Sequence, residues 1–238
     1  MDKETTEILK SVHRARSEVY GFFDKFFRLL PDEEFYGMVE QNLPRLKEIS
    51  DGCENEDMRE GVAKLEDFFT QKAALDEKAR AEYLLDALRR YTSLFCLTDS
   101  VPATESSYTS PTGNSMDDAY SEMKQLMRKY GFQRSEDVHE YEDHISMESA
   151  FMAKLASMSA DMLTEGGIEK YKQLADEQFA FHKNHFDRWI SDFVGVVLAY
   201  PVPEQVFKAM SRFLRGYLSE DKKLLSEIME NWNNCRGE

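Results

Sequence analysis

Apolar residues recur every three or four positions along most of this chain, which is the spacing that places them on one face of an α-helix. The first stripe runs over 8–30. A second follows Asp32, whose carboxylate suits the positive end of a helix, and Pro44 is expected to break or kink that helix. Two more stripes predict a third helix over 58–69 and a fourth from about 76 to 95.

The second half of the chain shows the same periodicity. Ser115 opens a capping-box-like start for a helix that Gly131 is placed to end. No segment shows the sustained alternation of apolar and polar residues that is typical of strands. The pattern therefore predicts an all-α fold, a single globular bundle of about nine or ten helices around a shared core. The remaining helices are predicted over 151–163, 168–200, 206–217 and 224–232.

Two stretches lack this periodicity. Residues 98–115 are rich in Ser, Thr and Pro, and a loop of this length is either a functional segment or an ordinary surface connection. Residues 132–143 form an acidic loop. The 238 residues can bury a sizeable core. We expect one all-helical domain over 1–238, with halves of about 1–131 and 144–238 joined by the acidic loop.

The chain carries a formal net charge of −15. A field of this sign repels nucleic-acid phosphates and anionic lipid headgroups and attracts cationic ligands, including arginine-bearing peptides. The alternative is that the acidic surface only keeps the protein soluble and binds no particular partner. The longest apolar run, 193–200, is too short to span a bilayer. We therefore expect neither a nucleic-acid partner nor stable membrane insertion.

The ends and the cysteines indicate a cytoplasmic location. The first seven residues are polar and acidic, unlike a signal peptide. Cys53, Cys96 and Cys235 are scattered and form no CxxC pair, a usage that favours reduced thiols over disulfides or a zinc cluster. Cys96 follows an apolar run and is expected to lie in the core.

The densest chemistry lies over 136–148, where six carboxylates and two histidines precede an apolar stripe. Such a stretch could hold a metal, perform acid/base chemistry or receive a cationic partner. Glu136 and His139 have the i, i+3 spacing of di-iron helical bundles, but those sites need a second such pair, which the sequence lacks. The enzyme alternative is a metal-dependent helical-bundle enzyme that uses the cluster Glu136, His139, His144, His182 and His185.

Other catalytic signatures are missing from the sequence, which contains no HExxH, no GxSxG and no glycine-rich phosphate loop. Asp143 and His144 are adjacent, so on a helix they point about 100° apart and would not form a dyad. In a purely structural role, Asp143 would cap the following helix while His144 packs on its first turn. Nucleophilic catalysis therefore has little support, while acid/base catalysis by these two residues stays an open alternative at this point.

Seven of the twelve methionines fall on the two predicted helices that flank the acidic loop. Methionine makes adaptable apolar surfaces that accept varied peptides. An acidic mouth beside such a surface would suit a ligand with a basic end and an apolar stretch, which is the composition of bacterial export signals. The alternative is that these side chains fill the core. They are Met116, Met123, Met127, Met147, Met152, Met158 and Met162.

Three segments, in order, resemble motifs of the TorD/DmsD/NarJ family of redox-enzyme maturation chaperones. The sequence EYEDHI over 140–145 is similar to the family signature E-P-x-D-H-[IL], with Tyr141 in place of the proline. The sequence YTSLF over 91–95, with the later PATESSY over 102–108, is similar to the segment Y-x-x-L-F…P-x-x-E-S-x-[YW]. The spacing F-x-x-x-H-x-x-x-W over 181–189 is similar to a third segment.

This resemblance implies a TorD-like fold and a cytoplasmic chaperone without catalytic turnover. We therefore expect that the chain is not an enzyme and holds neither a cofactor nor a metal. Its partner would be the twin-arginine signal peptide and precursor of a molybdopterin-containing oxidoreductase subunit, whose folding, cofactor insertion and export it would oversee. The family's helix exchange implies a monomer or a helix-swapped homodimer, with 132–143 as the hinge. The expected signal-peptide-binding residues are Glu140, Tyr141, Glu142, Asp143, His144, Met147, Glu105, Tyr108, His185 and Trp189.

Overall fold

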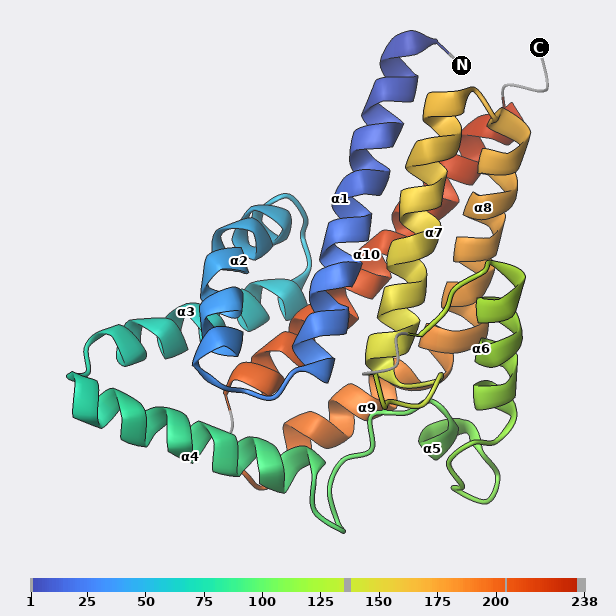
Figure 1. Cartoon of the computed structure of the whole chain (residues 1–238). Helices are drawn as coiled ribbons and strands as arrows, with labels where there is room; N and C mark the ends of the chain where they lie inside the picture. The colour runs from blue at the N-terminus through green and yellow to red at the C-terminus, as the bar shows by residue number, and fades with distance from the viewer. Residues whose placement is uncertain (1, 135–137, 204, 235–238) are drawn as a thin grey trace. The chain divides into compact units, whose positions relative to one another are not determined.

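Helices form most of the chain in the computed structural model, which describes residues 2–134, 138–203 and 205–234 (Figure 1). Within those ranges there is no β-strand, only an isolated bridge between Thr104 and His144. The predicted all-α class is confirmed. The helices of the first half are α1 (Lys3–Arg28), α2 (Glu33–Asp51), α3 (Glu56–Ala73), α4 (Glu77–Phe95), α5 (Ser106–Thr109) and α6 (Asp118–Lys129).

The second half holds longer helices and one segment of different winding. A π-helical segment, η1 (His182–Phe186), joins α8 directly to α9, so the predicted helix over 168–200 changes its winding midway. The α-helices of this half are α7 (Ile145–Glu165), α8 (Ile168–Phe181), α9 (Asp187–Ala199) and α10 (Val206–Asn234).

Polar side chains cap the starts of α2, α3 and α4. The Asp32 carboxylate accepts a hydrogen bond from the backbone N–H of Phe35, which fixes the start of α2. Asn55 and Asp76 do the same for α3 and α4. Each cap satisfies a backbone donor that the first helical turn leaves without a partner.

Three boundary predictions are corrected by the structure. Pro44 does not break α2, which continues through it because Val39 and Leu46, on either side, are both buried, while the kink stays a prediction. The start of α6 is capped by Asp117 rather than Ser115. The helices predicted over 206–217 and 224–232 are one helix, α10, because buried Leu218 and Asp221 continue its inner face between them.

The described residues group into two compact units. Unit 1 comprises the chain up to Arg28, residues 104–189 and the chain from Asp221 onward. Unit 2 comprises residues 29–103 and 190–220. Helices α9 and α10 therefore contribute residues to both units. The expectation of one domain with halves on either side of 132–143 stays a prediction.

Unit 1 is built on α1, α7 and α8, which run alongside one another, with α1 against α7 and α7 against α8 (Figure 1). A polar network lies inside it. The Arg16 guanidinium on α1 donates two hydrogen bonds to the Asp221 carboxylate, of 2.5 and 2.8 Å, and both side chains are buried. Burial alone would raise the pKa of Asp221, but Arg16 and His182 outweigh it and hold that pKa well below its usual range.

Unit 2 is held by aromatic stacking and by close helix contact. Phe35 of α2 stacks on Phe207 of α10, with ring centroids 5.5 Å apart. A Cβ placed on Gly61 of α3 would lie 2.7 Å from the backbone carbonyl oxygen of Ala209, so α3 and the first half of α10 approach closely only because this residue is glycine. Arg215 of α10 donates two hydrogen bonds, of 2.6 and 2.7 Å, to the Asp57 carboxylate on α3.

Candidate functional site

The site begins where the acidic loop enters α7. The N-cap of α7 is His144, not Asp143, and its Nδ1 accepts a hydrogen bond of 3.2 Å from the backbone N–H of Ser146. Asp143 therefore does not cap the helix, which corrects the structural role that the sequence suggested for it. Since Nδ1 accepts this bond, the imidazole is neutral, and the partial burial of His144 lowers its pKa to about 4.

Asp143 instead connects two of the motif segments through hydrogen bonds. Its Oδ2 accepts a hydrogen bond of 2.9 Å from the backbone N–H of Ser106, and its backbone carbonyl accepts another of 2.9 Å from that of Glu105. The adjacent bridge between Thr104 and His144 extends this contact. Residues 104–106 and 143–144 thus lie side by side. Asp143 is fully buried, and its Oδ1 has no hydrogen-bond partner.

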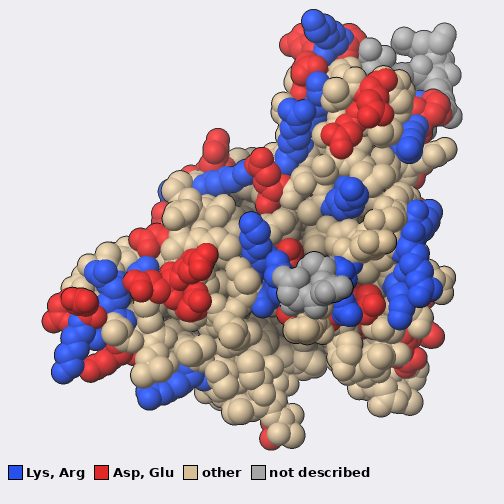
Figure 2. All heavy atoms as spheres, in the orientation of Figure 1, with Lys and Arg blue, Asp and Glu red and all other residues tan. Residues whose placement is uncertain are grey.

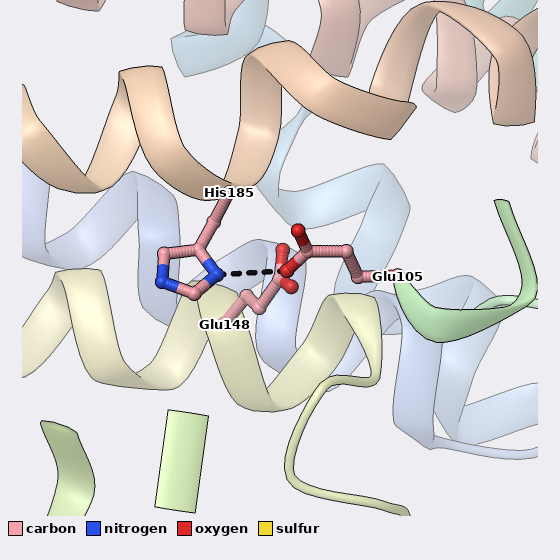
Figure 3. A group of neighbouring side chains, drawn as sticks. All are labelled: Glu105, Glu148 and His185. Atoms are coloured by element: carbon pink, nitrogen blue, oxygen red, sulfur yellow. Dashed lines mark hydrogen bonds and ion pairs between the residues drawn. The ribbon is translucent and has the colours of Figure 1, made fainter. Parts of the chain in front are cut away.

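Three buried side chains near this contact, those of Glu105, Glu148 and His185, point toward one another (Figure 3). The Nδ1 of His185 lies 2.7 Å from a carboxylate oxygen of Glu105. Glu148, on α7, points into the same space and accepts a hydrogen bond of 3.2 Å from the Trp189 indole N–H. Glu105 and Glu148 are fully buried, and His185 is 3% exposed. We call Glu105, Glu148 and His185 the carboxylate–histidine cluster.

The electrostatics of this cluster are unusual because negative groups outnumber nearby cations. Burial raises the pKa of Glu148 well above its ordinary value. The charge of Glu105, a hydrogen bond between the Glu148 and Glu105 carboxyl groups, and the charge of Asp143 raise it further. The Arg188 guanidinium reaches the second oxygen of Glu105 at 3.3 Å and the Glu122 carboxylate at the same distance. Of the three buried carboxyl groups, Arg188 therefore pairs, among the described residues, with that of Glu105 alone.

The winding of η1 is part of how the cluster forms. Its two histidines are both buried but serve different partners: His182 lies 2.9 Å from Asp221, while His185 lies against Glu105. A π-helical turn is wider than an α-helical one, and such turns are frequent at functional sites. The sequence gives no sign of it, because the apolar stripe continues through the segment.

The exposed part of the site is the loop before α7. Tyr141 is 43% exposed and packs edge-on against Tyr120 of α6, with ring centroids 6.3 Å apart. Glu140 and Glu142, on either side of it, are half-buried. The backbone carbonyl of Glu140 accepts a hydrogen bond of 2.7 Å from Arg134, which holds the loop.

The expected binding residues therefore differ in solvent exposure. Five are accessible to a ligand in whole or part, and five are buried. Tyr108 connects the two groups, because it is half-buried and its ring lies 5.5 Å from that of buried Trp189. The accessible residues are Glu140, Tyr141, Glu142, His144 and Tyr108. The buried residues are Glu105, Asp143, Met147, His185 and Trp189.

The methionines mostly fill the core. Four of the seven are buried, so they offer no surface to a peptide, and the core-filling alternative is correct for them: Met123, Met127, Met147 and Met152. Met116 alone among the seven is largely exposed, at 52%.

An open pocket of about 740 Å³ lies beside the cluster in unit 1. Residues of α6 line one side, and residues of η1 and the start of α9 line the other. Sequence reasoning missed this pocket and Arg188, and it counted Glu148 in the acidic stretch without expecting it to be a binding residue. The lining residues are Glu122, Gln125, Leu126, Lys129, Lys183, Asn184, His185 and Arg188.

Among the residues that the structure describes, the metal cluster of the enzyme alternative is not assembled. Glu136 lies outside the described residues. His139 is exposed on the loop, while His182 belongs to the Asp221 network. Within the described part of the chain, the group close enough to hold an ion is the carboxylate–histidine cluster, which contains only His185 of the five residues named for that alternative.

Fold and site together define an all-helical protein whose motif residues meet at the start of α7. Comparison with protein families gives a match to the nitrate reductase delta subunit family over residues 51–195. The chain belongs to this family, the NarJ/TorD chaperones, as the motif resemblance predicts. A comparison with curated proteins gave no match.

Membership of this family implies a chaperone that assembles a molybdoenzyme and partners its catalytic subunit. Chaperones of the family are non-catalytic, which supports the prediction that this chain is not an enzyme. None of the helices in the described ranges is both long and apolar enough to cross a membrane.

Proposed function

We propose that this chain binds the twin-arginine signal peptide of a molybdopterin oxidoreductase catalytic subunit in the cytoplasm. By holding the signal, it assists folding and cofactor insertion and delays export until both are complete. The observation that carries the proposal is the position of the acidic loop. Half-buried Glu140 and Glu142 flank exposed Tyr141, in a loop that is fixed at its end by the contact of Asp143 with Ser106.

The chemistry of this loop suits guanidinium groups. Arginine presents a planar fork of donors that pairs with carboxylates in a bidentate manner, which lysine cannot reproduce. Among the described residues, Glu142 makes no ion pair, so its carboxylate is available to a ligand. The carboxylate of Asp143, the next residue, is buried and adds to the negative field without needing to touch the ligand.

Aromatic side chains supply the remaining surface. Tyr141 can stack on a guanidinium, an interaction that strengthens as water is excluded. Tyr108, supported from behind by Trp189, offers a ring to an apolar residue of the signal. The net charge of −15 favours the approach of a cationic peptide from a distance.

The proposal is tested by replacing the two accessible carboxylates. Glu140→Gln with Glu142→Gln is expected to weaken binding of a twin-arginine peptide about tenfold or more, because two charge-assisted contacts of about 1–3 kcal/mol each are reduced. Isothermal titration calorimetry gives the affinity. Both side chains lie outside the core, so circular dichroism should be unchanged.

The matched control is Glu165→Gln with Glu169→Gln, which changes the net charge equally at exposed positions on α7 and α8. It should bind within about twofold of the wild type, since a distant charge is screened at moderate salt. Equal losses in both double variants would show that only the overall charge matters and would remove the loop from the binding site.

A further inference from the structure

We propose that the carboxylate–histidine cluster of Glu105, Glu148 and His185 binds a divalent first-row transition-metal ion such as Zn²⁺. The site would be distinct from the exposed loop that meets the signal peptide. The bound ion would link residue 105, α7 and η1 and so stabilise the residues that hold that loop in place.

The geometry is that of a nearly formed three-ligand site. One oxygen of Glu105, one oxygen of Glu148 and one ring nitrogen of His185 all lie within 4.8 Å of one another. Ligands at about 2.0–2.2 Å from a common zinc ion are themselves roughly 3–4 Å apart. Small side-chain rotations therefore suffice to close the site, and the three ligands come from three separate parts of unit 1 (Figure 3).

Unpartnered oxygens point independently to a missing cation. When both carboxyl groups are ionised, the Oε1 of Glu148 has no hydrogen-bond partner, although this side chain is fully buried and aimed at the other two. The Oε1 of Glu105 likewise accepts no hydrogen bond and has only the ion pair with Arg188 at 3.3 Å. Buried polar atoms are nearly always paired, because an unpaired one loses its hydration without compensation. A metal ion would satisfy both oxygens at once.

The surroundings resemble the outer shell of a metal site. Ligands in such sites are held by hydrogen bonds from neighbouring residues, which fix their orientation. Here the Trp189 indole N–H donates to the second oxygen of Glu148, and Phe181 stacks on the His185 ring with centroids 4.6 Å apart. Both contacts immobilise a proposed ligand without occupying its free atom.

An ion also has a path to the cluster. His185 and Arg188 line the open pocket of about 740 Å³, so the cluster borders solvent-accessible space on one side. Water from that pocket can complete the coordination, since three protein ligands leave an open position. One imidazole and two carboxylates form a nitrogen and oxygen donor set that suits zinc, manganese or iron rather than a thiolate-preferring ion.

The test is a zinc titration of the full chain after removal of metal by a chelator. A competing chromophoric chelator reports the affinity. The wild type is expected to bind one Zn²⁺ per chain and to unfold at a higher temperature with zinc than without it. Glu148→Gln should weaken binding at least tenfold and lose the temperature shift. This variant keeps an oxygen for Trp189 and is therefore expected to fold.

The control is His139→Gln, which removes an exposed histidine outside the cluster and should bind zinc like the wild type. A wild type that binds no stoichiometric zinc would overturn the proposal and leave a proton, not a metal ion, between the two carboxylates. Equal affinities of wild type and Glu148→Gln would overturn it as well. So would a loss of binding in His139→Gln, because it would identify a surface site.

Discussion

Single residues in this protein serve roles that depend on burial, which sequence alone does not disclose. Asp143 and Glu142 are neighbours in a motif, yet Asp143 is fully buried and Glu142 is only half-buried. Cys96 was expected in the core but is exposed, because it follows the last turn of α4 and lies two positions after the buried Leu94. The motifs indicate which residues belong to the site, but its depth is set by tertiary contacts.

His13 gives a prediction at this scale. Its Nδ1 lies 2.9 Å from an Arg16 nitrogen, so it accepts a hydrogen bond and the ring is neutral. Burial first, and then the Arg16 charge, lower the pKa of His13 to about 3 from the ordinary 6.5. In the unfolded chain the ring takes up a proton below about pH 6.5. The stability it contributes is therefore complete above pH 6.5 and is lost as the pH falls toward 3.

Urea unfolding at a series of pH values measures this effect. Between pH 6.5 and 4, His13→Asn should show a shallower fall in the free energy of unfolding, by up to about 1.4 kcal/mol per pH unit, which corresponds to one proton. His139→Asn makes the same substitution at an exposed position and should follow the wild type. Parallel curves for wild type and His13→Asn would contradict the neutral, buried assignment.

At the scale of the helix, apolar spacing predicted most elements, because each helix buries one face. The failures have local causes. Pro44 does not interrupt α2, since burial on both sides of it outweighs the lost hydrogen bond. The apolar pattern predicted two helices where α10 is one. The residue that continues the buried face between them, Asp221, is charged and therefore does not belong to an apolar stripe. The pairing of Asp221 with Arg16 joins residues 205 positions apart, which a local pattern cannot reveal.

Helix packing in unit 2 gives a second prediction. Gly61→Ala should lower the free energy of unfolding by about 1–3 kcal/mol, because the new methyl group would meet the backbone of Ala209 on α10, which cannot move aside as a side chain can. Urea unfolding midpoints measure it. Gly195→Ala, on α9, is the control. No heavy atom lies within 4 Å of its added Cβ, so it should be neutral or stabilising by about 0.5–1 kcal/mol. Similar effects at both positions would contradict the close approach.

At the scale of the whole molecule, the sequence predicts the net charge and the family but not how the chain divides into two compact units. The family match over residues 51–195 includes every expected binding residue, all of which lie in unit 1. That unit is assembled from three stretches of chain, a division that depends on contacts between distant residues. Acidic and basic side chains are interspersed over the face in Figure 2, so the charge of −15 is not gathered into one patch there.

If the chain binds a twin-arginine peptide as proposed, local geometry has to supply the selectivity that an overall negative field cannot. A uniform field attracts any cation, whereas carboxylates held at fixed positions distinguish a guanidinium from an ammonium group. The fixed end of the acidic loop, where Asp143 contacts Ser106, provides such positions. Whether the chain is a monomer or a helix-swapped homodimer with 132–143 as its hinge stays a prediction.

The most direct test of the central claim compares two peptides on the wild-type chain. One carries the twin-arginine pair with its following apolar segment, and the other differs only in having two lysines. The total charge is the same, so calorimetry isolates recognition of the guanidinium groups. We predict that the arginine peptide binds about tenfold more tightly or better, equivalent to about 1.4 kcal/mol. Equal affinities, or no binding of the arginine peptide, would contradict the claim.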